Sequence, residues 1–436
     1  IKQLIIHYYK LPGNPYTARI DTQDWNMIFA VRPSLVLLNL MAAIKGTDTV
    51  LGKIYFNSQK QDLNLQVSAP KIQYNQQVIH KLDLVAGTKK DQINYSLNIA
   101  DAGQNGFRIY KTSLSGDIKN DKLFTTLLLK DKKDKDRYML SGTLTQLTHA
   151  VRFIFNPDSL MLNYDRWNIP ADNYVQYDSA GILVRNLKLK HNAELLSINS
   201  NGETTQSPLG FEFSNFHIRT ITQFAEQDSL LLDGLVNGKA EVKDLFTKPL
   251  FTSDLKIRDL SYMADTVGNL VLKVSNEEQN AFAAHILLNG RGNDVSIDGK
   301  YFSGESKMDL AVKLNQLNLV SLKSLAASQI KDMKGFLKGN LHASGNLSNP
   351  VFKGSLYFDS AEIVPVITGE PLRIGADSIG FDNEGFNFSE FSMLDSAGNK
   401  ATLDGNVYTS DFRKYRFDMT FSTDNFRVVN APKEPN

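Results

Sequence analysis

We expect an all-β fold for this chain of 436 residues. Apolar and polar residues alternate along much of it, as in "MDLAVKLNQLNL", where Leu310, Val312 and Leu314 would share one face of a strand. Turn sequences such as "DSAGN" (395–399) and "NGRGND" (289–294) separate the alternating segments at intervals of about ten residues. Helical periodicity is scarce. These three observations predict a chain of many short strands.

Two segments have the apolar period of a helix instead. In "SLKSLAASQIKDM" (321–333), Leu322 and Leu325 fall on one apolar stripe with polar residues opposite. A second such segment lies near 34–45 and ends at Gly46. We therefore expect a few short amphipathic helices within the β structure.

One part of the sequence repeats after 101 residues without a gap. The residues that match in this register are Phe211 and Val312, Phe213 and Leu314, Ile221 and Leu322, Phe224 and Leu325, Gly234 and Gly335, Gly238 and Gly339, Pro249 and Pro350, and Leu255 and Leu356. A third, partial copy follows, because "GNDVSIDG" (292–299) resembles "GNKATLDG" (398–405). Tandem units of this kind stack on their neighbours into one elongated body.

Composition excludes several classes of partner and site. The chain has 48 basic and 47 acidic side chains, so it has no net field that would attract nucleic acid. It has no cysteine, which excludes disulfides and thiolate metal sites. The longest apolar run, 35–44, is about half of the roughly 20 residues that span a bilayer. Since the chain opens on Ile1, we expect a signal or membrane anchor outside it.

The sequence has no catalytic, cofactor-binding or metal-binding motif. Its seven histidines are scattered, and no nucleophile elbow or phosphate-binding loop is present. We therefore expect no enzyme, no cofactor and no metal. The densest charge run, "KDKKDKDR" (130–137), has mixed signs and lies between two apolar segments. A solvated hairpin tip explains it better than a binding site does.

Four stretches give the chain a recognisable resemblance to a family. They are "GLVNGKAEVKDLFTKPLFTSDLKI" (234–257), its repeat at 335–358, the segment 166–202 from "RWNIP" to "INSNG", and "DSAGNKATLDGNVY" (395–408). Together they resemble the TamB family of the AsmA-like superfamily, in its Bacteroidetes branch. The likeness covers residues 140–436 and extends to the first 140 only as a general pattern. A complete member has an anchor and a C-terminal domain that are not evident in this chain.

The resemblance implies a fold, a location and partners. The fold would be an elongated, repetitive and open β-sheet groove, often called a β-taco, with an apolar inner face. Such proteins bridge the inner and outer membranes across the periplasm and meet an outer-membrane barrel of the Omp85 class, which is TamA-like. The implied function is outer-membrane biogenesis, in which the trough shields acyl chains during phospholipid transport. The alternative is a scaffold for the assembly or insertion of outer-membrane barrels.

Under this reading the chain has four consecutive parts. Residues 1–140 would form the N-terminal part of the groove with the helix near 34–45, and 141–208 and 209–309 would each form one groove repeat. Residues 310–436 would form a further repeat that is truncated at its end. The expected lining of the groove is Val184, Leu187, Leu189, Phe211, Phe213, Leu255, Ile257, Val312, Leu314, Leu341, Leu356, Phe358, Phe417, Met419 and Phe421.

Other structures and functions fit the same alternation. A closed β-sandwich or a solid β-solenoid also has strands with one apolar face, and the pattern alone does not tell an open groove from a closed core. An extracellular adhesin or glycan-binding solenoid is a third function. It would need exposed aromatic ladders, and the two tryptophans, Trp25 and Trp167, argue against it.

Overall fold

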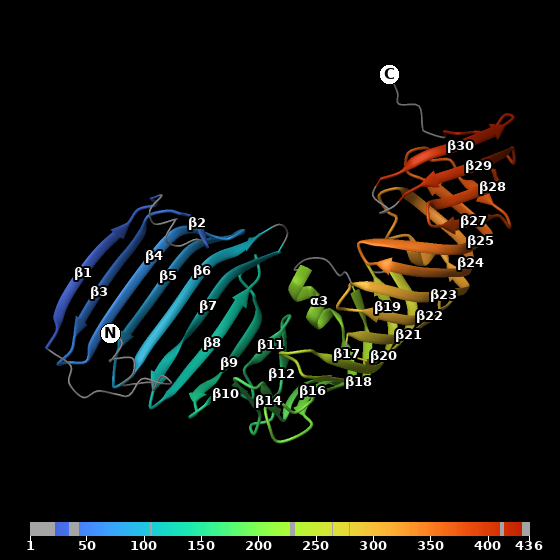
Figure 1. Cartoon of the computed structure of the whole chain (residues 1–436). Helices are drawn as coiled ribbons and strands as arrows, with labels where there is room; N and C mark the ends of the chain where they lie inside the picture. Colours follow the sequence, from blue (N-terminus) through green and yellow to red (C-terminus); the bar gives the residue numbers. More distant parts are fainter. Residues whose placement is uncertain are drawn as a thin grey trace. The chain divides into compact units, whose positions relative to one another are not determined.

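The computed structural model describes residues 22–34, 43–104, 107–226, 232–263, 265–278, 280–409 and 414–429. It is almost entirely antiparallel β-structure in two large sheets, which confirms the predicted all-β, repetitive fold class (Figure 1). The contacts divide the chain into two compact units. The first comprises residues 1–214 and 220–229, and the second comprises 215–219 and 230–436.

The first unit is a meander of strands joined by short turns. Its strands run in the order β1-β3-β4-β5-β6-β7-β8-β9-β10-β13-β14, while β2 pairs with β4 and the small hairpin β11–β12 lies beside β9. Their bounds are β1 (Asp24–Val31), β2 (Ile44–Thr47), β3 (Val50–Asn57), β4 (Asp62–Tyr74), β5 (Gln77–Thr88), β6 (Ile93–Gln104), β7 (Phe107–Lys119), β8 (Lys122–Lys130), β9 (Asp136–Gln146), β10 (Ala150–Phe155), β11 (Leu160–Leu162), β12 (Asp165–Trp167), β13 (Tyr174–Asp178) and β14 (Ile182–Arg185).

Three more strands and a helix follow. The strands β15 (Leu187–His191), β16 (Glu194–Ser200) and β17 (Leu209–His217) pair antiparallel in this order. Helix α3 (Arg219–Glu226) comes next, and its residues from Thr220 onward belong to the first unit. This helix matches, in the 101-residue register, part of the segment 321–333 for which the sequence predicts a helix.

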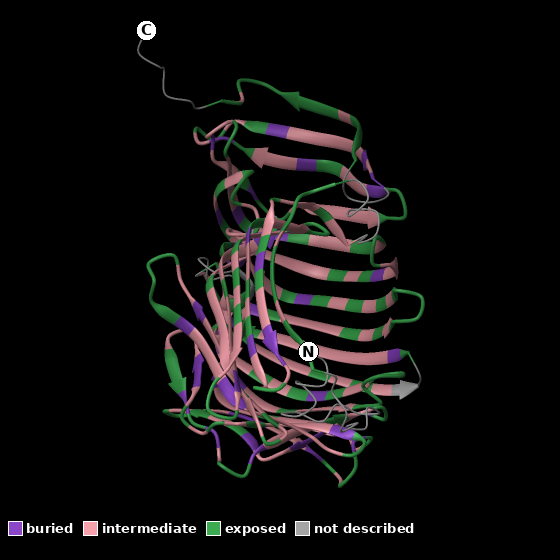
Figure 2. Ribbon diagram, turned by 90° about the vertical axis from the view of Figure 1, so that its left-hand side faces the viewer, coloured by how far each residue is buried: buried purple, intermediate pink, exposed green. Residues whose placement is uncertain are grey.

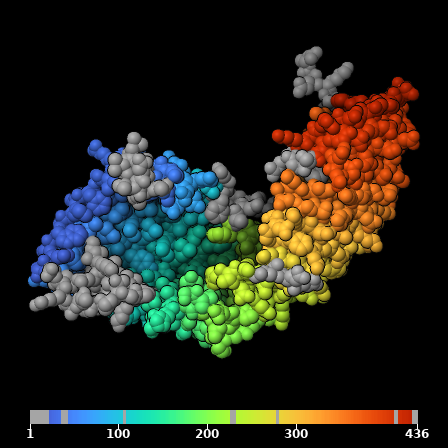
Figure 3. Space-filling model, viewed as in Figure 1, coloured from blue at the N-terminus to red at the C-terminus, as the bar shows by residue number. Residues whose placement is uncertain are grey.

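The second unit is also a meander. Its strands follow the order β18 to β26 and then β28-β29-β30, with β27 paired to both β25 and β28. Their bounds are β18 (Leu232–Lys243), β19 (Leu250–Tyr262), β20 (Asp265–Glu278), β21 (Ala281–Gly290), β22 (Asn293–Phe302), β23 (Lys307–Asn318), β24 (Ile330–Asn346), β25 (Asn349–Pro365), β26 (Leu372–Ile374), β27 (Ser378–Asp382), β28 (Gly385–Leu394), β29 (Lys400–Tyr408) and β30 (Arg416–Thr423). Within each unit the sequence colours change gradually, since most strands lie beside their sequence neighbours (Figure 3).

The predicted hairpin tip is confirmed for residues 131–135, whereas Arg137, the last residue of the charge run, lies on β9 and is buried. Residues 131–135 connect β8 to β9, and the Asp131 carboxylate accepts the backbone N–H of Lys133 at 2.8 Å and of Lys135 at 2.9 Å. The hydrogen bond from Lys135 is the main cause that lowers the pKa of Asp131. A short polar side chain therefore closes this turn by bonding its own backbone.

The helix predicted over 321–333 is wrong for most of its length. A 3₁₀-helix, η1 (Leu319–Leu322), is followed by turns, and strand β24 begins at Ile330. The apolar stripe still serves packing, because Leu322 and Ile330 contact a buried cluster around Phe358. From Ile330 onward the segment pairs with β25, and its backbone forms hydrogen bonds to that strand. These interstrand bonds would be lost if the segment were helical. The other predicted helix, near 34–45, lies mostly outside the described residues.

The backbone repeats the 101-residue offset that the sequence predicts. A register shift lies between Asp233 and Leu235 in the first copy and between Lys334 and Phe336 in the second. Gly238 and Gly339 occupy matching places, opposite Leu255 and Leu356. Both have positive φ, 128° and 141°, and a Cβ atom on either would lie 2.1–2.2 Å from a carbonyl oxygen of the neighbouring strand. Only glycine fits this position. The boundaries of the four predicted parts stay predictions.

The Gly339→Ala variant should be less stable than the parent protein by about 2–3 kcal/mol, because alanine strains the backbone at this φ and meets the Ser355 carbonyl oxygen. The matched control is Gly375→Ala, since no atom lies within 4 Å of a Cβ placed there. Urea denaturation followed by circular dichroism measures both variants. Equal midpoints for the two would contradict the close approach.

A buried carboxylate organises the turn between β28 and β29. The Asp395 side chain is fully buried and accepts four hydrogen bonds, from the backbone N–H groups of Ala397, Asn399 and Arg427 and from the Asn399 amide. Burial alone would raise the pKa of Asp395, but these hydrogen bonds to the charged form outweigh it and lower the pKa to about 2. The carboxylate thus joins the segment that contains Arg427 to this turn.

The Asp395 carboxylate should make the stability of the second unit fall in acid. The folded-state pKa of Asp395 lies below the ordinary aspartate value of 3.8, so the stabilisation is present above about pH 4 and is lost as the pH falls towards about 2. Asp395→Asn should be less stable near neutral pH, and its unfolding midpoint should fall less steeply between pH 5 and pH 2.5 than that of the parent. Parallel pH profiles for the two proteins would refute this role.

Candidate functional site

A continuous row of apolar side chains crosses six neighbouring strands of the second unit. Each member lies directly opposite the next in the antiparallel register. We call it the second-unit row, and it consists of Leu255 on β19, Leu272 on β20, Ile286 on β21, Ile297 on β22, Val312 on β23 and Leu341 on β24. Residues directly opposite in a sheet share one face, so the six side chains form a stripe across the strands.

Another apolar row runs beside the first one, two residues along each strand. Its members are Val236, Ile257, Leu270, Leu288, Val295 and Leu314, and Leu356 continues it beyond Gly339. Positions two apart on a strand point to the same side. The two rows therefore make one apolar face that extends from β18 to β25.

The opposite face of the same strands is polar and charged. Asp254, Lys273, His285 and Asp298 are direct neighbours there, one on each strand from β19 to β22. Their charges pair across strands: the Lys273 ammonium lies 3.4 Å from Asp254, and His285 bonds Asp298. This face suits contact with water, and its mixed signs keep the local field small.

The first unit has a row of the same kind, which sequence reasoning missed. It crosses β4 to β9 through Val67, Leu84, Leu97, Leu114, Leu127 and Leu140, and we call it the first-unit row. Its signal was present in alternating segments such as "HKLDLV" (80–85) and "YSLNI" (95–99). The predicted lining came from the repeat and the family motifs, which lie later in the sequence, so it contains no residue before Val184.

Exposure distinguishes these rows from the core of a closed sandwich. Every member of the first-unit and second-unit rows is half-buried, and none is either fully buried or fully exposed. Figure 2 shows the same intermediate exposure over most of the strands, with buried residues scattered among them. Side chains between two packed sheets would be almost completely buried instead. The rows are thus apolar surfaces that a ligand can still reach.

The predicted lining residues fall into three groups. Leu255, Val312 and Leu341 lie in the second-unit row, and Ile257 and Leu356 lie in the row beside it. Leu189, Phe211 and Phe213 are half-buried on β15 and β17, and on β30 Met419 is half-buried while Phe417 and Phe421 are exposed. The buried residues are Val184, Leu187, Leu314 and Phe358.

These four buried residues contribute to packing more than to an accessible surface. Phe358 belongs to the buried cluster with Leu319 and Met333, and its ring contacts Phe391 edge to face, with centroids 5.7 Å apart. The alternating pattern does not predict that these residues are buried, because a buried and an accessible apolar face have the same alternation.

An apolar cavity of about 330 Å³ lies at one end of the first-unit row. Helix α3 covers it, and Leu127 and Leu140, the last two members of the row, are part of its wall. The remaining lining comes from β8, β9, β11 and α3 and is made of Leu129, Tyr138, Met139, Leu160, Met161, Leu162, Thr220, Ile221 and Phe224. The only sequence signal for this site was the match of Ile221 and Phe224 to Leu322 and Leu325.

The described residues offer no metal centre, since none of their His, Asp and Glu side chains gather in groups of three or more. Several histidines instead pair with one aspartate across neighbouring strands, as His80 does with Asp101 at 2.9 Å and His342 with Asp309 at 2.7 Å. Across the described ranges, no helix has the length and apolar character to cross a membrane.

Comparison with known proteins assigns no family to this chain. No protein-family model matches the chain, and no curated protein matches it. The resemblance to the TamB family therefore rests on the residues quoted above, and the function has to be argued from the apolar rows.

Proposed function

We propose that this chain is part of a periplasm-spanning β-groove protein of outer-membrane biogenesis, which shields lipid acyl chains during phospholipid transport between the membranes. The observation that carries the proposal is the pair of half-buried apolar rows, each crossing six strands. The resemblance to the TamB family supplies the expected setting. Its partners would be phospholipid, an Omp85-type barrel in the outer membrane, and the inner membrane through an anchor outside this chain.

The energetics explain why an apolar row suits lipid transport. Burial of one methylene contributes about 0.8 kcal/mol, so an acyl chain of about 15 methylenes loses on the order of 12 kcal/mol when it enters water. Contact with half-buried leucine, isoleucine and valine side chains along a row would offset much of that cost. Transport of this kind needs no cofactor and no catalytic residue, because no covalent bond changes.

The length of each row also fits an acyl chain. Neighbouring strands lie about 4.8 Å apart, so six strands extend roughly 24 Å. One leaflet of a bilayer has a hydrocarbon layer of about 15 Å, half of the whole core. A single row therefore exceeds the length of one acyl chain in a leaflet. The polar opposite face, with ion pairs such as Lys273 and Asp254, would remain in water.

A photocrosslinking amino acid at Val312 or Leu97 should capture phospholipid in cells that make the full-length protein. The same group at Lys313 or Asn98 is the matched control, because these next residues point to the opposite face. Mass spectrometry of the crosslinked protein identifies the lipid. Adducts at Lys313 and Asn98 but not at Val312 and Leu97 would reject the proposal.

A second function, a scaffold for barrel assembly, has one observation in its favour. The strand β30 pairs with β29 and with no other strand of the described residues. Its Phe417 and Phe421 are 67% and 47% exposed, so this edge offers both unpaired backbone groups and apolar side chains. Such an edge can receive a strand from another protein by β-augmentation.

Substitutions at the row and at the edge separate the two functions. Lipid transport predicts that Val312→Asp impairs the outer-membrane barrier, while the double variant Phe417→Glu, Phe421→Glu leaves it intact. Charges on the exposed edge should change the stability by no more than about 0.5 kcal/mol. Sensitivity of cells to a large antibiotic measures the barrier. The reverse pattern would favour the scaffold.

A further inference from the structure

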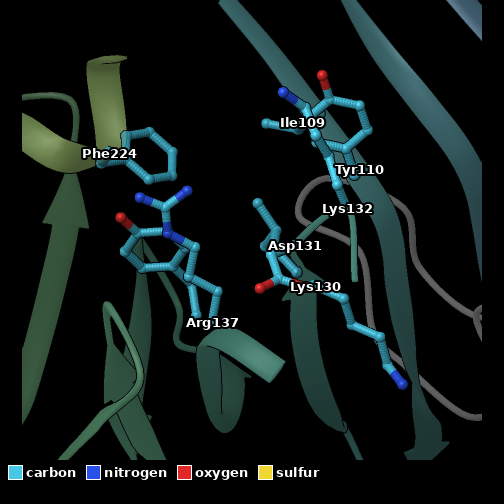
Figure 4. A pocket seen from close by; sticks show the side chains of 9 residues that line it. Ile109, Tyr110, Lys130, Asp131, Lys132, Arg137 and Phe224 are labelled. Carbon is cyan, nitrogen blue, oxygen red and sulfur yellow. The ribbon is translucent and has the colours of Figure 1, made fainter. Parts of the chain in front are cut away.

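A small polar pocket adjoins the cavity under α3 and shares Leu129, Tyr138 and Phe224 with it. We call this pocket the rim of the cavity, and one buried guanidinium lies there. Arg137 is 8% exposed, and its Nε donates to the Asn163 side-chain oxygen at 3.2 Å. Its terminal nitrogen donates to the backbone oxygen of Gln223 on α3, also at 3.2 Å. Figure 4 shows the guanidinium beside the Phe224 ring, which belongs to the cavity wall. Arg137 therefore both holds the helix and lies at the edge of the apolar space.

Within the part of the chain that the structure describes, the charge of Arg137 has no directly paired carboxylate. Among the described residues, no carboxylate lies within 4 Å of its guanidinium; its other neighbours are the rings of Tyr138 and Tyr164, at 5.4 and 5.6 Å. Asp131 also lines the rim, but its carboxylate accepts the Tyr164 hydroxyl at 2.8 Å and closes the hairpin turn. A buried cation without a paired anion is costly to a fold, so an anion from outside would be stabilised here.

A second polar group lies at the same place. The Tyr138 hydroxyl is buried and makes no hydrogen bond of good geometry, and the nearby Arg137 guanidinium interacts with it. Burial raises the pKa of Tyr138, so the hydroxyl stays protonated and can donate a hydrogen bond. The ring of the same tyrosine lines the apolar cavity and contacts Phe224 edge to face, with centroids 5.1 Å apart. Tyr138 thus has one end in the apolar space and the other near Arg137.

We propose that this cavity binds one acyl chain of an anionic amphiphile, with the carboxylate or phosphate of that molecule held by Arg137 and Tyr138. Charge complementarity selects the anionic head, because the buried cation of Arg137 lies at this place and Lys132 also lines the rim. Lys130 contributes less, since its ammonium extends away from Arg137 (Figure 4) and lies 3.5 Å from Asp134 and 3.6 Å from Asp136. A volume of about 330 Å³ is at the lower end of ligand pockets and fits one chain rather than two.

The position of the cavity connects this site to the proposed function. Leu127 and Leu140 belong both to the first-unit row and to the cavity wall, so an acyl chain that moves along the row reaches the cavity without leaving apolar contact. The inference deepens the proposed function and rests on it for the source of the ligand. It adds a selective site for anionic lipid where the row alone would accept any acyl chain.

Binding of a fluorescent fatty acid, 11-(dansylamino)undecanoic acid, to the purified full chain tests the proposal. Dodecanoate and dodecyl phosphate should displace the probe at concentrations at least tenfold lower than dodecanol or dodecyltrimethylammonium does. Vesicles of phosphatidylglycerol, added in a separate arm, distinguish a diacyl phospholipid source from free single-chain molecules. Equal displacement by the anionic, neutral and cationic compounds would overturn the proposal.

Three variants and one control locate the binding. Arg137→Gln should weaken dodecanoate about tenfold or more and leave dodecanol unchanged, since a charged hydrogen bond is lost, whereas Arg137→Lys should restore part of the affinity. Ile221→Asp should abolish binding of the probe, and its side chain is exposed enough for the fold to tolerate the change. Arg152→Gln is the matched control, because Arg152 bonds Gln176 outside the cavity.

The second-unit row variant Val312→Asp separates this proposal from the proposed function. Binding of the probe should survive in Val312→Asp and be lost in Ile221→Asp. If instead Val312→Asp abolishes binding while Arg137→Gln and Ile221→Asp do not, the cavity is not the site, although lipid shielding by the rows stands. Thermal unfolding of every variant shows that each one is folded.

Discussion

The register of antiparallel pairing is the constraint on which the rest of this structure depends. Because side chains alternate with a period of two, a shift of one residue in any strand would move its apolar residues to the opposite face. Along each row six consecutive strands stay in register, so Leu272, Ile286 and Ile297 become neighbours although each lies on a different strand. A row of apolar side chains is therefore a property of the pairing, and no single strand contains it.

Two glycines of the repeat allow this pairing at positions where a Cβ atom would collide with the neighbouring strand. Gly238 and Gly339 lie against carbonyl oxygens of the next strand in both copies of the repeat, and the register shifts recur at the same offset. The repeat in the sequence is thus a repeat of backbone geometry. Its apolar face can extend over many strands, since neighbouring strands satisfy their hydrogen bonds with one another.

Helix α3 changes what the first unit can do. Under the proposed function, the rows alone would treat all acyl chains alike, because apolar contact has no direction and no preference for a head group. Arg137 and Tyr138 bring a charge and a donor to the end of one row, where the low dielectric of the cavity strengthens both. Affinity for lipid would come from the rows, and selectivity from the cavity under the helix.

The sequence by itself determined the all-β class, the charged hairpin tip at 131–135 and the repeat that aligns Gly238 with Gly339, because alternation and turn chemistry are local. It did not determine which apolar residues stay accessible: Val312 is half-buried while Leu314, two residues later on the same face, is buried. Nor did it predict that the segment 321–333 becomes turns and a strand, or that Arg137 meets α3. Tertiary structure decided these points, since burial, strand pairing and the approach of distant side chains depend on residues that local patterns do not contain.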